Sequence, residues 1–221
     1  AKPTGVVALT GARIITMKGD EVIEQGTIVV AGNRIVAVGP NASVTIPADA
    51  KVIDASGKTI LPGLIDMHGH IDCCYDSGVM PRKQGPRYAA LAFGVTTNFD
   101  PYSSELPNYE SRETDLAGIT VGPRWIGSGN PIYGRARKSD FTYVPLREYE
   151  DARKALLRKQ ALGGTIVKSY KQPGRQQRQM LVKAGRATGV MVDVEGEGHF
   201  HNSISMVLDG HSNIEHNPPV A

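Results

Sequence analysis

Two histidines separated by a single residue, His68 and His70, end the segment LPGLIDMHGH (61–70). Side chains alternate faces along a strand, so residues two apart point the same way. Two neutral imidazoles that converge beyond the end of an apolar strand suit a divalent metal, with zinc first among them. The alternative is a pair of unrelated polar histidines in a loop. The apolar run and the Pro-Gly turn before the pair favour the metal site.

This segment resembles the first barrel strand of the amidohydrolase superfamily, whose motif is P-G-[LFM]-[IV]-D-x-H-x-H. The motif residues present are Pro62, Gly63, Leu64, Ile65, Asp66, His68 and His70. The preceding family pattern, D-x-x-G-k-x-[VIL]-x-P-G, is met by Asp54, Gly57, Lys58, Ile60, Pro62 and Gly63. The resemblance is to imidazolonepropionase-like and prolidase-like members and runs from about residue 6 to the last residue. It implies an α/β fold, a (β/α)₈ TIM barrel with an N-terminal β-sandwich lobe.

The resemblance also implies further ligands. Lys168, in GGTIVKSY, matches a fourth-strand lysine that CO₂ often carbamylates in this family, so that it bridges two metals. A lysine is costly to bury unless it is used, although it could instead extend its ammonium outward to solvent. His216, in SNIEH, matches the sixth-strand histidine. Tyr170 follows the lysine and is expected at the rim of the site, where it would help to hold the substrate.

The fifth strand departs from the family pattern, because Asp193 occupies the place where a histidine is expected. Asp193 and Glu195 share a strand face, and carboxylates are competent zinc ligands. We expect Glu195 to be the fifth-strand ligand, with His201 as the second choice. A superfamily branch found beside TolB-like propellers has a similar series of motifs. Its counterparts here are Lys168-Ser169-Tyr170, Glu195-Gly196, His201-Asn202, Asp209-Gly210-His211, Glu215-His216 and Pro219.

Two regions are expected from the pattern of elements. Residues 1–58 are rich in β-branched residues interrupted by turn signals, which predicts part of a β-sandwich lobe. Residues 59–221 alternate strands with helices, which predicts a parallel sheet. The expected strands are 60–66, 95–99, 122–128, 165–169, 190–194 and 213–216, and the expected helices are 145–164, 173–189 and 202–210. Six βα units fall short of the eight of a closed barrel, so we expect an incomplete barrel, a fragment of a longer protein, that pairs with itself or with a complementing chain.

The composition excludes some other partners. The 221 residues carry a net charge of +3, and the basic residues are dispersed, whereas nucleic-acid binding needs a dense basic stripe with interleaved aromatics. No apolar run is long enough to span a membrane. No signal peptide is visible at the start of the sequence, which leaves a cytoplasmic or exported location open.

The expected activity is metal-dependent hydrolysis of a C–N bond in an amide, peptide-like or cyclic amide substrate, with one or two divalent metals acidifying the attacking water. The family's eighth-strand aspartate, which takes the proton from that water, has no counterpart in this sequence, so the activity of these residues alone is left open. Two alternatives remain, a metal-binding but inactive fragment or scaffold and a deaminase on the same barrel. The sequence names no particular substrate.

Overall fold

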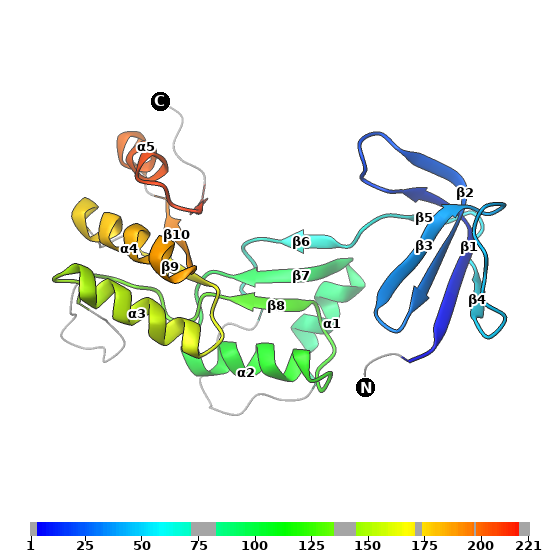
Figure 1. Ribbon diagram of the computed structural model, residues 1–221, viewed down its shortest axis with the longest axis horizontal. Coiled ribbons are helices and arrows are strands. Elements are labelled where there is room, and N and C mark those ends of the chain that lie inside the picture. The colour runs from blue at the N-terminus through cyan, green and yellow to red at the C-terminus, as the bar shows by residue number, and fades with distance from the viewer. Residues whose placement is uncertain (1–3, 72–82, 135–144, 171–173, 197, 217–221) are drawn as a thin grey trace. The chain divides into compact units, whose positions relative to one another are not determined.

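The computed structural model describes residues 4–71, 83–134, 145–170, 174–196 and 198–216 (Figure 1). The chain forms two compact units, Ala1–Leu64 and Ile65–Ala221. The boundary therefore lies six residues beyond the expected one, on the strand that leads to His68. Within the described residues, no helix is long and apolar enough to cross a membrane.

The N-terminal unit is a five-stranded sheet. Its strands follow the order β3-β2-β1-β4, with β5 also paired to β1. Strands β1, β2 and β3 are antiparallel neighbours, whereas β4 and β5 run parallel to β1. A small apolar cluster stabilises the sheet; its buried members are Ala12, Ile14, Ile28 and Ala55. The strands are β1 (Val6–Ile15), β2 (Val22–Ala31), β3 (Arg34–Pro40), β4 (Lys51–Asp54) and β5 (Thr59–Ile60).

The second unit alternates strands with helices, as expected. Its strands are β6 (Leu64–Asp66), β7 (Val95–Asp100), β8 (Arg124–Gly127), β9 (Ile166–Ser169), β10 (Met191–Glu195) and β11 (Asn213–Glu215). Its helices are α1 (Gly85–Ala92), α2 (Glu105–Leu116), α3 (Tyr149–Ala161), α4 (Arg175–Thr188) and α5 (Phe200–Asp209). The sequence interpretation missed α1 and α2. Helix α1 is short, and α2, with the sequence ELPNYESRETDL, has too few apolar residues to show a helical stripe.

The strands form two sheets, with the orders β6-β7-β8 and β11-β10-β9. Strands β7 and β8 are parallel, and so are β9, β10 and β11. Ile132 links the segment after β8 to β9, because its amide donates to the carbonyl of Lys168 (2.8 Å) and its carbonyl accepts from Tyr170 (3.0 Å). The carboxyl ends of parallel strands meet at one edge, which is where the candidate site lies.

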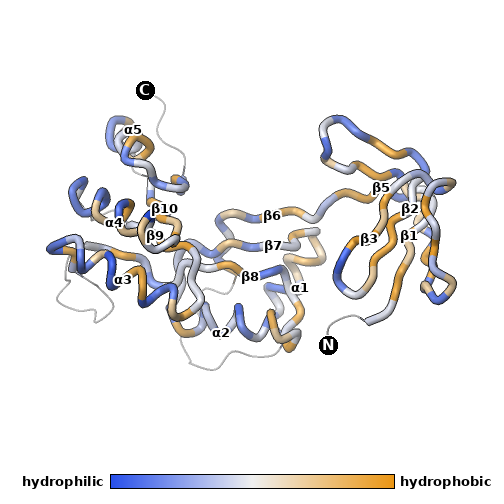
Figure 2. Tube along the Cα trace, viewed as in Figure 1, coloured by the Kyte–Doolittle hydropathy of each residue, from blue (hydrophilic) through white to orange (hydrophobic). Residues whose placement is uncertain are grey.

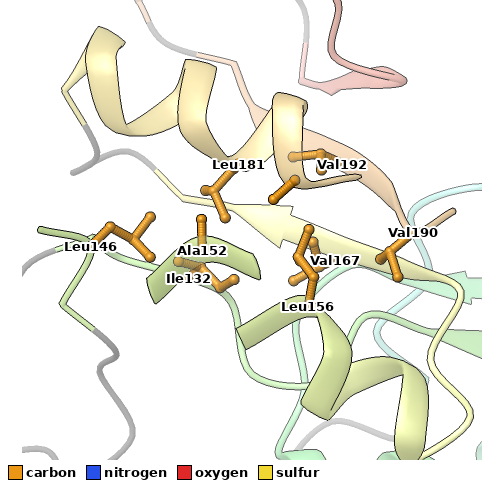
Figure 3. Packing of buried hydrophobic residues seen from close by; sticks show 9 residues of the cluster. Ile132, Leu146, Ala152, Leu156, Val167, Leu181, Val190 and Val192 are labelled. Atoms are coloured by element: carbon orange, nitrogen blue, oxygen red, sulfur yellow. The ribbon is translucent and has the colours of Figure 1, made fainter. Parts of the chain in front are cut away.

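Helices α3 and α4 cover one face of β9 and β10. Hydrophilic and hydrophobic colours alternate along both helices in Figure 2, which reflects their amphipathic patterns. Leu156 of α3 and Leu181 of α4 are fully buried against Val167 and Val192 of the sheet (Figure 3). Because faces alternate along a strand, the neighbouring Lys168 is directed to the opposite face. The apolar layer thus fixes the strands, and their other face carries the polar side chains of the site.

Glycines end two of these helices, at the last positions of the expected ranges 173–189 and 202–210. Gly189 follows α4 with a φ of 75°, and Gly210 follows α5 with a φ of 87°. Both are in the left-handed conformation that glycine adopts at little cost. These stops turn the chain directly into β10 and β11, which carry the last site residues.

Candidate active site

The backbone at Gly69 sets the position of the two histidines on either side of it. The amide of Gly69 donates to the carbonyl of Phe99 (2.9 Å), and the side-chain amide of Asn98 donates to the carbonyl of Gly69 (2.8 Å). A Cβ at this position would lie 1.9 Å from Oδ1 of Asn98, so only glycine fits so close to β7. The segment after β6 is therefore held against β7, with His68 and His70 flanking the contact.

Each of these histidines is oriented by a buried carboxylate. Nδ1 of His70 lies 2.8 Å from Oδ1 of Asp100, the last residue of β7, and Nδ1 of His68 contacts the carboxylate of Glu215, the last residue of β11. Asp100 is fully buried and Glu215 is 3% exposed. A carboxylate at Nδ1 accepts its proton, which assigns the lone pair of each ring to Nε2.

The two Nε2 atoms face each other across 3.2 Å. Two nitrogens bound at 2.0–2.1 Å to one tetrahedral zinc stand roughly 3.4 Å apart, so this separation fits two ligands of a single ion. Support of each metal-bound imidazole by a carboxylate at the other nitrogen is the usual arrangement in such sites. The expected convergence of His68 and His70 is therefore present, with carboxylate supports that the sequence interpretation did not identify.

Lys168, Glu195 and His216 form a second group beside the pair. Nζ of Lys168 lies 2.5 Å from Oε2 of Glu195, and Oε1 of the same carboxylate lies 3.2 Å from Nε2 of His216. The His216 ring in turn lies 4.8 Å from the His68 ring, centre to centre. Lys168 is 2% exposed, so it does not extend to solvent. The fourth, fifth and sixth strands of the expected barrel thus each contribute a residue next to the histidine pair.

The chain bends sharply where His216 leaves β11. Its φ is 64°, in the left-handed region that non-glycine residues seldom occupy. A backbone in this conformation costs of order 1–3 kcal/mol and is found most often at functional positions. The bend coincides with the place where His216 meets Glu195, which supports a functional role for the residue.

Asp193, the residue in place of the family's histidine, supports Glu215. Burial, followed by the hydrogen bond to Glu215 and the charge on that residue, raises the pKa of Asp193 to about 8. The carboxyl of Asp193 therefore keeps its proton at neutral pH and can donate it to Glu215, which accepts. This leaves Glu195 as the fifth-strand carboxylate that faces Lys168 and His216.

Asp100, the last residue of β7, has two roles in the structure. Its Oδ1 accepts from the amide of Tyr102 (2.9 Å), as an end-cap would, and also contacts His70. Burial raises the pKa of Asp100 above its ordinary value, against the lowering effect of these hydrogen bonds. The signal in the sequence is that Asp100 and Glu215 each end a strand at the edge that carries the histidines.

The structure brings together five of the six expected ligands and leaves out His201. That residue lies on the exposed surface of α5, where its ring packs 5.8 Å from Phe200. Tyr170 is half-buried, and Nζ of Lys168 lies 5.6 Å from the centre of its ring. Across the described part of the chain, no three His, Cys, Asp or Glu side chains converge closely enough to hold a metal. The imidazole and carboxylate groups are of types that bind metals, and the separation of the histidine pair fits one ion. In this structure His216 and Lys168 instead contact Glu195 directly.

Sequence relatives match only part of the chain, and no family model matches it. Adenine deaminase 3 of Rhizobium meliloti is 34% identical over 46% of this chain and 16% of its own length. Enamidase of Eubacterium barkeri is 35% identical over 44% of this chain and 24% of its own length. Imidazolonepropionase of Yersinia pestis is 44% identical over 37% of this chain and 21% of its own length. The chain therefore spans at most about a quarter of the length of these relatives in alignment.

Solved structures share the fold over nearly the whole chain. A Bifidobacterium longum protein provisionally described as a prolidase superposes with a TM-score of 0.77 at 23% identity, over 99% of this chain and 56% of its own. A Xaa-Pro dipeptidase with bound methionine superposes with a TM-score of 0.77 at 20% identity, over 96% of this chain and 62% of its own. In its motifs, its partial sequence matches and its fold, this chain is similar to members of the amidohydrolase superfamily.

Proposed function

We propose that this chain contributes the metal centre of a hydrolase that cleaves a C–N bond in an amide or cyclic amide. The observation that carries the proposal is the 3.2 Å approach of Nε2 of His68 to Nε2 of His70, each ring backed by a carboxylate. The framework we propose is an incomplete (β/α)₈ barrel of six βα units, 59–221, with a β-sandwich lobe in 1–58. Action on C–N bonds is in keeping with the names of the relatives.

The proposed ligands are His68, His70 and His216, with Lys168 and Glu195 completing the set. A divalent metal, zinc by its preference for imidazole and carboxylate, supplies Lewis acidity and lowers the pKa of bound water toward about 7. Asp100 and Glu215 hold the Nδ1 protons, so both imidazoles present their lone pairs to the same point. A hydrogen bond from Asp193 to Glu215 would hold that carboxylate against His68.

Lys168 is proposed to act as a carbamate. Its neutral amine would attack the carbon of CO₂, form an N–C bond and release one proton. Oε2 of Glu195 lies 2.5 Å from Nζ and is placed to take that proton. The product is an anionic oxygen ligand, in keeping with the burial of Lys168 next to the histidines. Tyr170, beside Lys168, is proposed to contact the substrate.

A second candidate is deamination of an aminated heterocycle at the same centre. It is favoured by the relative named adenine deaminase. Both reactions break a C–N bond with water and would use the same ligands. They differ only in the leaving group, so substrate choice separates them.

Metal analysis of purified protein tests the centre. Replacing both His68 and His70 with alanine should abolish stoichiometric zinc, measured by elemental mass spectrometry after dialysis, and His216→Ala should weaken its binding. His201→Ala is the matched control, because its imidazole is exposed on α5 away from the cluster. Unchanged zinc in the double variant would overturn the assignment. Loss of zinc in His201→Ala would make His201, in place of Glu195, the fifth-strand ligand.

The carboxylate supports give a second, graded test. Asp100→Asn keeps the size of the side chain but removes the charge that orients His70, so zinc affinity should fall about 10- to 100-fold. Competition with a chelator of known affinity measures this change. Turnover should then be assayed with dipeptides, N-acyl amino acids, cyclic imides and adenine. Release of ammonia from adenine without amide cleavage would favour the deaminase.

A further inference from the structure

Three tyrosines gather at the carboxyl ends of three neighbouring strand segments. Tyr102 comes shortly after β7, and Tyr170 follows β9 directly. Tyr133 lies in the segment after β8, next to Ile132, which pairs with β9. The Tyr170 ring lies 4.9 Å from the Tyr133 ring and 5.7 Å from the Tyr102 ring, centre to centre. These separations are typical of interacting aromatic pairs. The three rings therefore form one aromatic cluster at the edge of the sheet that carries the candidate metal centre.

This tyrosine cluster is tied to that centre at two points. The amide of Tyr102 donates to the same oxygen of Asp100 that contacts His70, with distances of 2.9 and 2.8 Å. On the other side, Nζ of Lys168 lies 5.6 Å from the centre of the Tyr170 ring and 2.5 Å from Glu195. A substrate held at the centre would thus lie beside the tyrosines.

The rings differ in burial, so one of them can anchor the cluster while another offers an exposed surface to a ligand. Tyr133 is only 7% exposed, whereas Tyr102 is 43% exposed. Oη of Tyr133 donates to Oη of Tyr102 (3.3 Å), so these hydroxyls are engaged with each other. What remains for recognition is the aromatic surface of the rings, which suits a flat apolar group better than a polar one.

We propose that Tyr102, Tyr133 and Tyr170 recognise an aryl group of the substrate, next to the C–N bond that is cleaved. This inference rests on the proposed function and narrows its substrate class to aryl amides. Tyr133 anchors the cluster, and Tyr102 presents the stacking face. A purely structural cluster would hold the three loops together without distinguishing aryl from alkyl ligands.

Binding of matched probes to the whole chain tests the proposal without requiring turnover. The probes are N-benzoylglycine, N-cyclohexanecarbonylglycine and N-(trimethylammonioacetyl)glycine, with affinity measured by calorimetry in the presence of zinc. The benzoyl probe should bind about two- to tenfold more tightly than the cyclohexyl probe, the range that an aromatic pair contributes beyond its buried area. Equal binding of these two, tighter binding of the cationic probe, or no binding of the benzoyl probe would overturn the proposal.

Variants of Tyr102 locate the preference. Tyr102→Phe keeps the ring and should keep the benzoyl preference, whereas Tyr102→Leu should lose it. Tyr88→Leu is the control, since Tyr88 lies on α1 with a similar exposure of 39%. Loss of the preference in Tyr88→Leu, or its retention in Tyr102→Leu, would contradict the assignment. An aryl preference in a chain that holds no zinc would remove the proposed function alone, and stoichiometric zinc without an aryl preference would remove this inference alone.

Discussion

The two sheets of the second unit are stabilised by different kinds of interaction. Strands β9 and β10 pack against α3 and α4 through an apolar layer centred on Leu156 and Leu181. Around β8, buried polar groups have a large part instead. Lys159 of α3, 4% exposed, binds Glu105 of α2 (2.5 Å) and the carbonyls of Ser128 (3.3 Å) and Asn130 (2.7 Å).

The difference matters because the two kinds of core respond differently to change. Removing part of an apolar layer costs the transfer free energy of the lost atoms and leaves a cavity that neighbours can partly fill. Removing one member of a buried ion pair leaves the other charge without compensation. The buried polar network around β8, called here the polar side, should therefore tolerate single substitutions less well than the apolar layer, called the apolar side. The polar side also positions the segment after β8 that carries Tyr133.

The largest effect is expected from Glu105→Ala. It leaves Lys159 buried without its carboxylate and also removes the partner of Arg158. The free energy of unfolding should fall by about 3–5 kcal/mol, measured by urea denaturation. Glu113→Ala, an exposed site on the same helix, is the control and should change it by less than about 0.5 kcal/mol. Replacing Glu105 and Lys159 together with methionine should cost less than Glu105→Ala alone, and a larger cost for the double variant would contradict this account.

Leu181→Ala tests the apolar side. Leu181 is fully buried between α4 and the sheet, so its truncation should lower the free energy of unfolding by about 2–5 kcal/mol. Leu157, 37% exposed on α3, provides the control and should cost less when truncated. If Leu181→Ala costs clearly more than Glu105→Ala, the apolar layer is the more sensitive of the two, and the comparison is reversed.

Tyr109, which lies near Glu105, should make the free energy of unfolding depend on pH. Burial, followed by the negative charge of Glu105, raises the pKa of Tyr109 from 10.0 to about 12. A raised pKa in the folded state contributes stability below pH 10 that is lost as the pH rises through 12. Two pKa units correspond to at most about 2.7 kcal/mol. Wild type should therefore lose more stability than Tyr109→Phe between pH 9 and 12 in urea titrations. Parallel curves for the two proteins would rule out this role for the hydroxyl.

The sequence predicted the elements that form the apolar layer, and the approach of His68 to His70, better than the buried polar network around β8. The strands β9–β11 and the helices α3, α4 and α5 follow from the alternation of strand and helix patterns, because apolar burial leaves a regular pattern. The approach of His68 to His70 follows from their spacing of two just beyond the end of a strand. The network of Glu105 and Lys159 leaves no such pattern, since its members are 54 residues apart and meet only in the folded chain. Asp100 and Glu215 were not identified as supports for the same reason, because their partners lie on other strands.

The smallest effect is expected at the ion pair between α4 and α5, whose arginine is exposed, in contrast to the buried pair of Glu105 and Lys159. Arg175 binds Asp209 through Nη2 (2.9 Å) and Nε (3.0 Å), and its guanidinium lowers the pKa of Asp209 below the ordinary 3.8. A lowered pKa contributes stability above the ordinary value that is lost as the pH falls through the folded value. Arg175 itself is exposed, so solvent and salt screen the pair, and Arg175→Ala should cost far less than Glu105→Ala. Thermal unfolding at pH 7 and pH 3 measures the change: the difference between wild type and Arg175→Ala should shrink at pH 3 and in high salt. A difference that is as large as that of Glu105→Ala, or that persists in both conditions, would mean that burial does not govern how this protein uses its ion pairs.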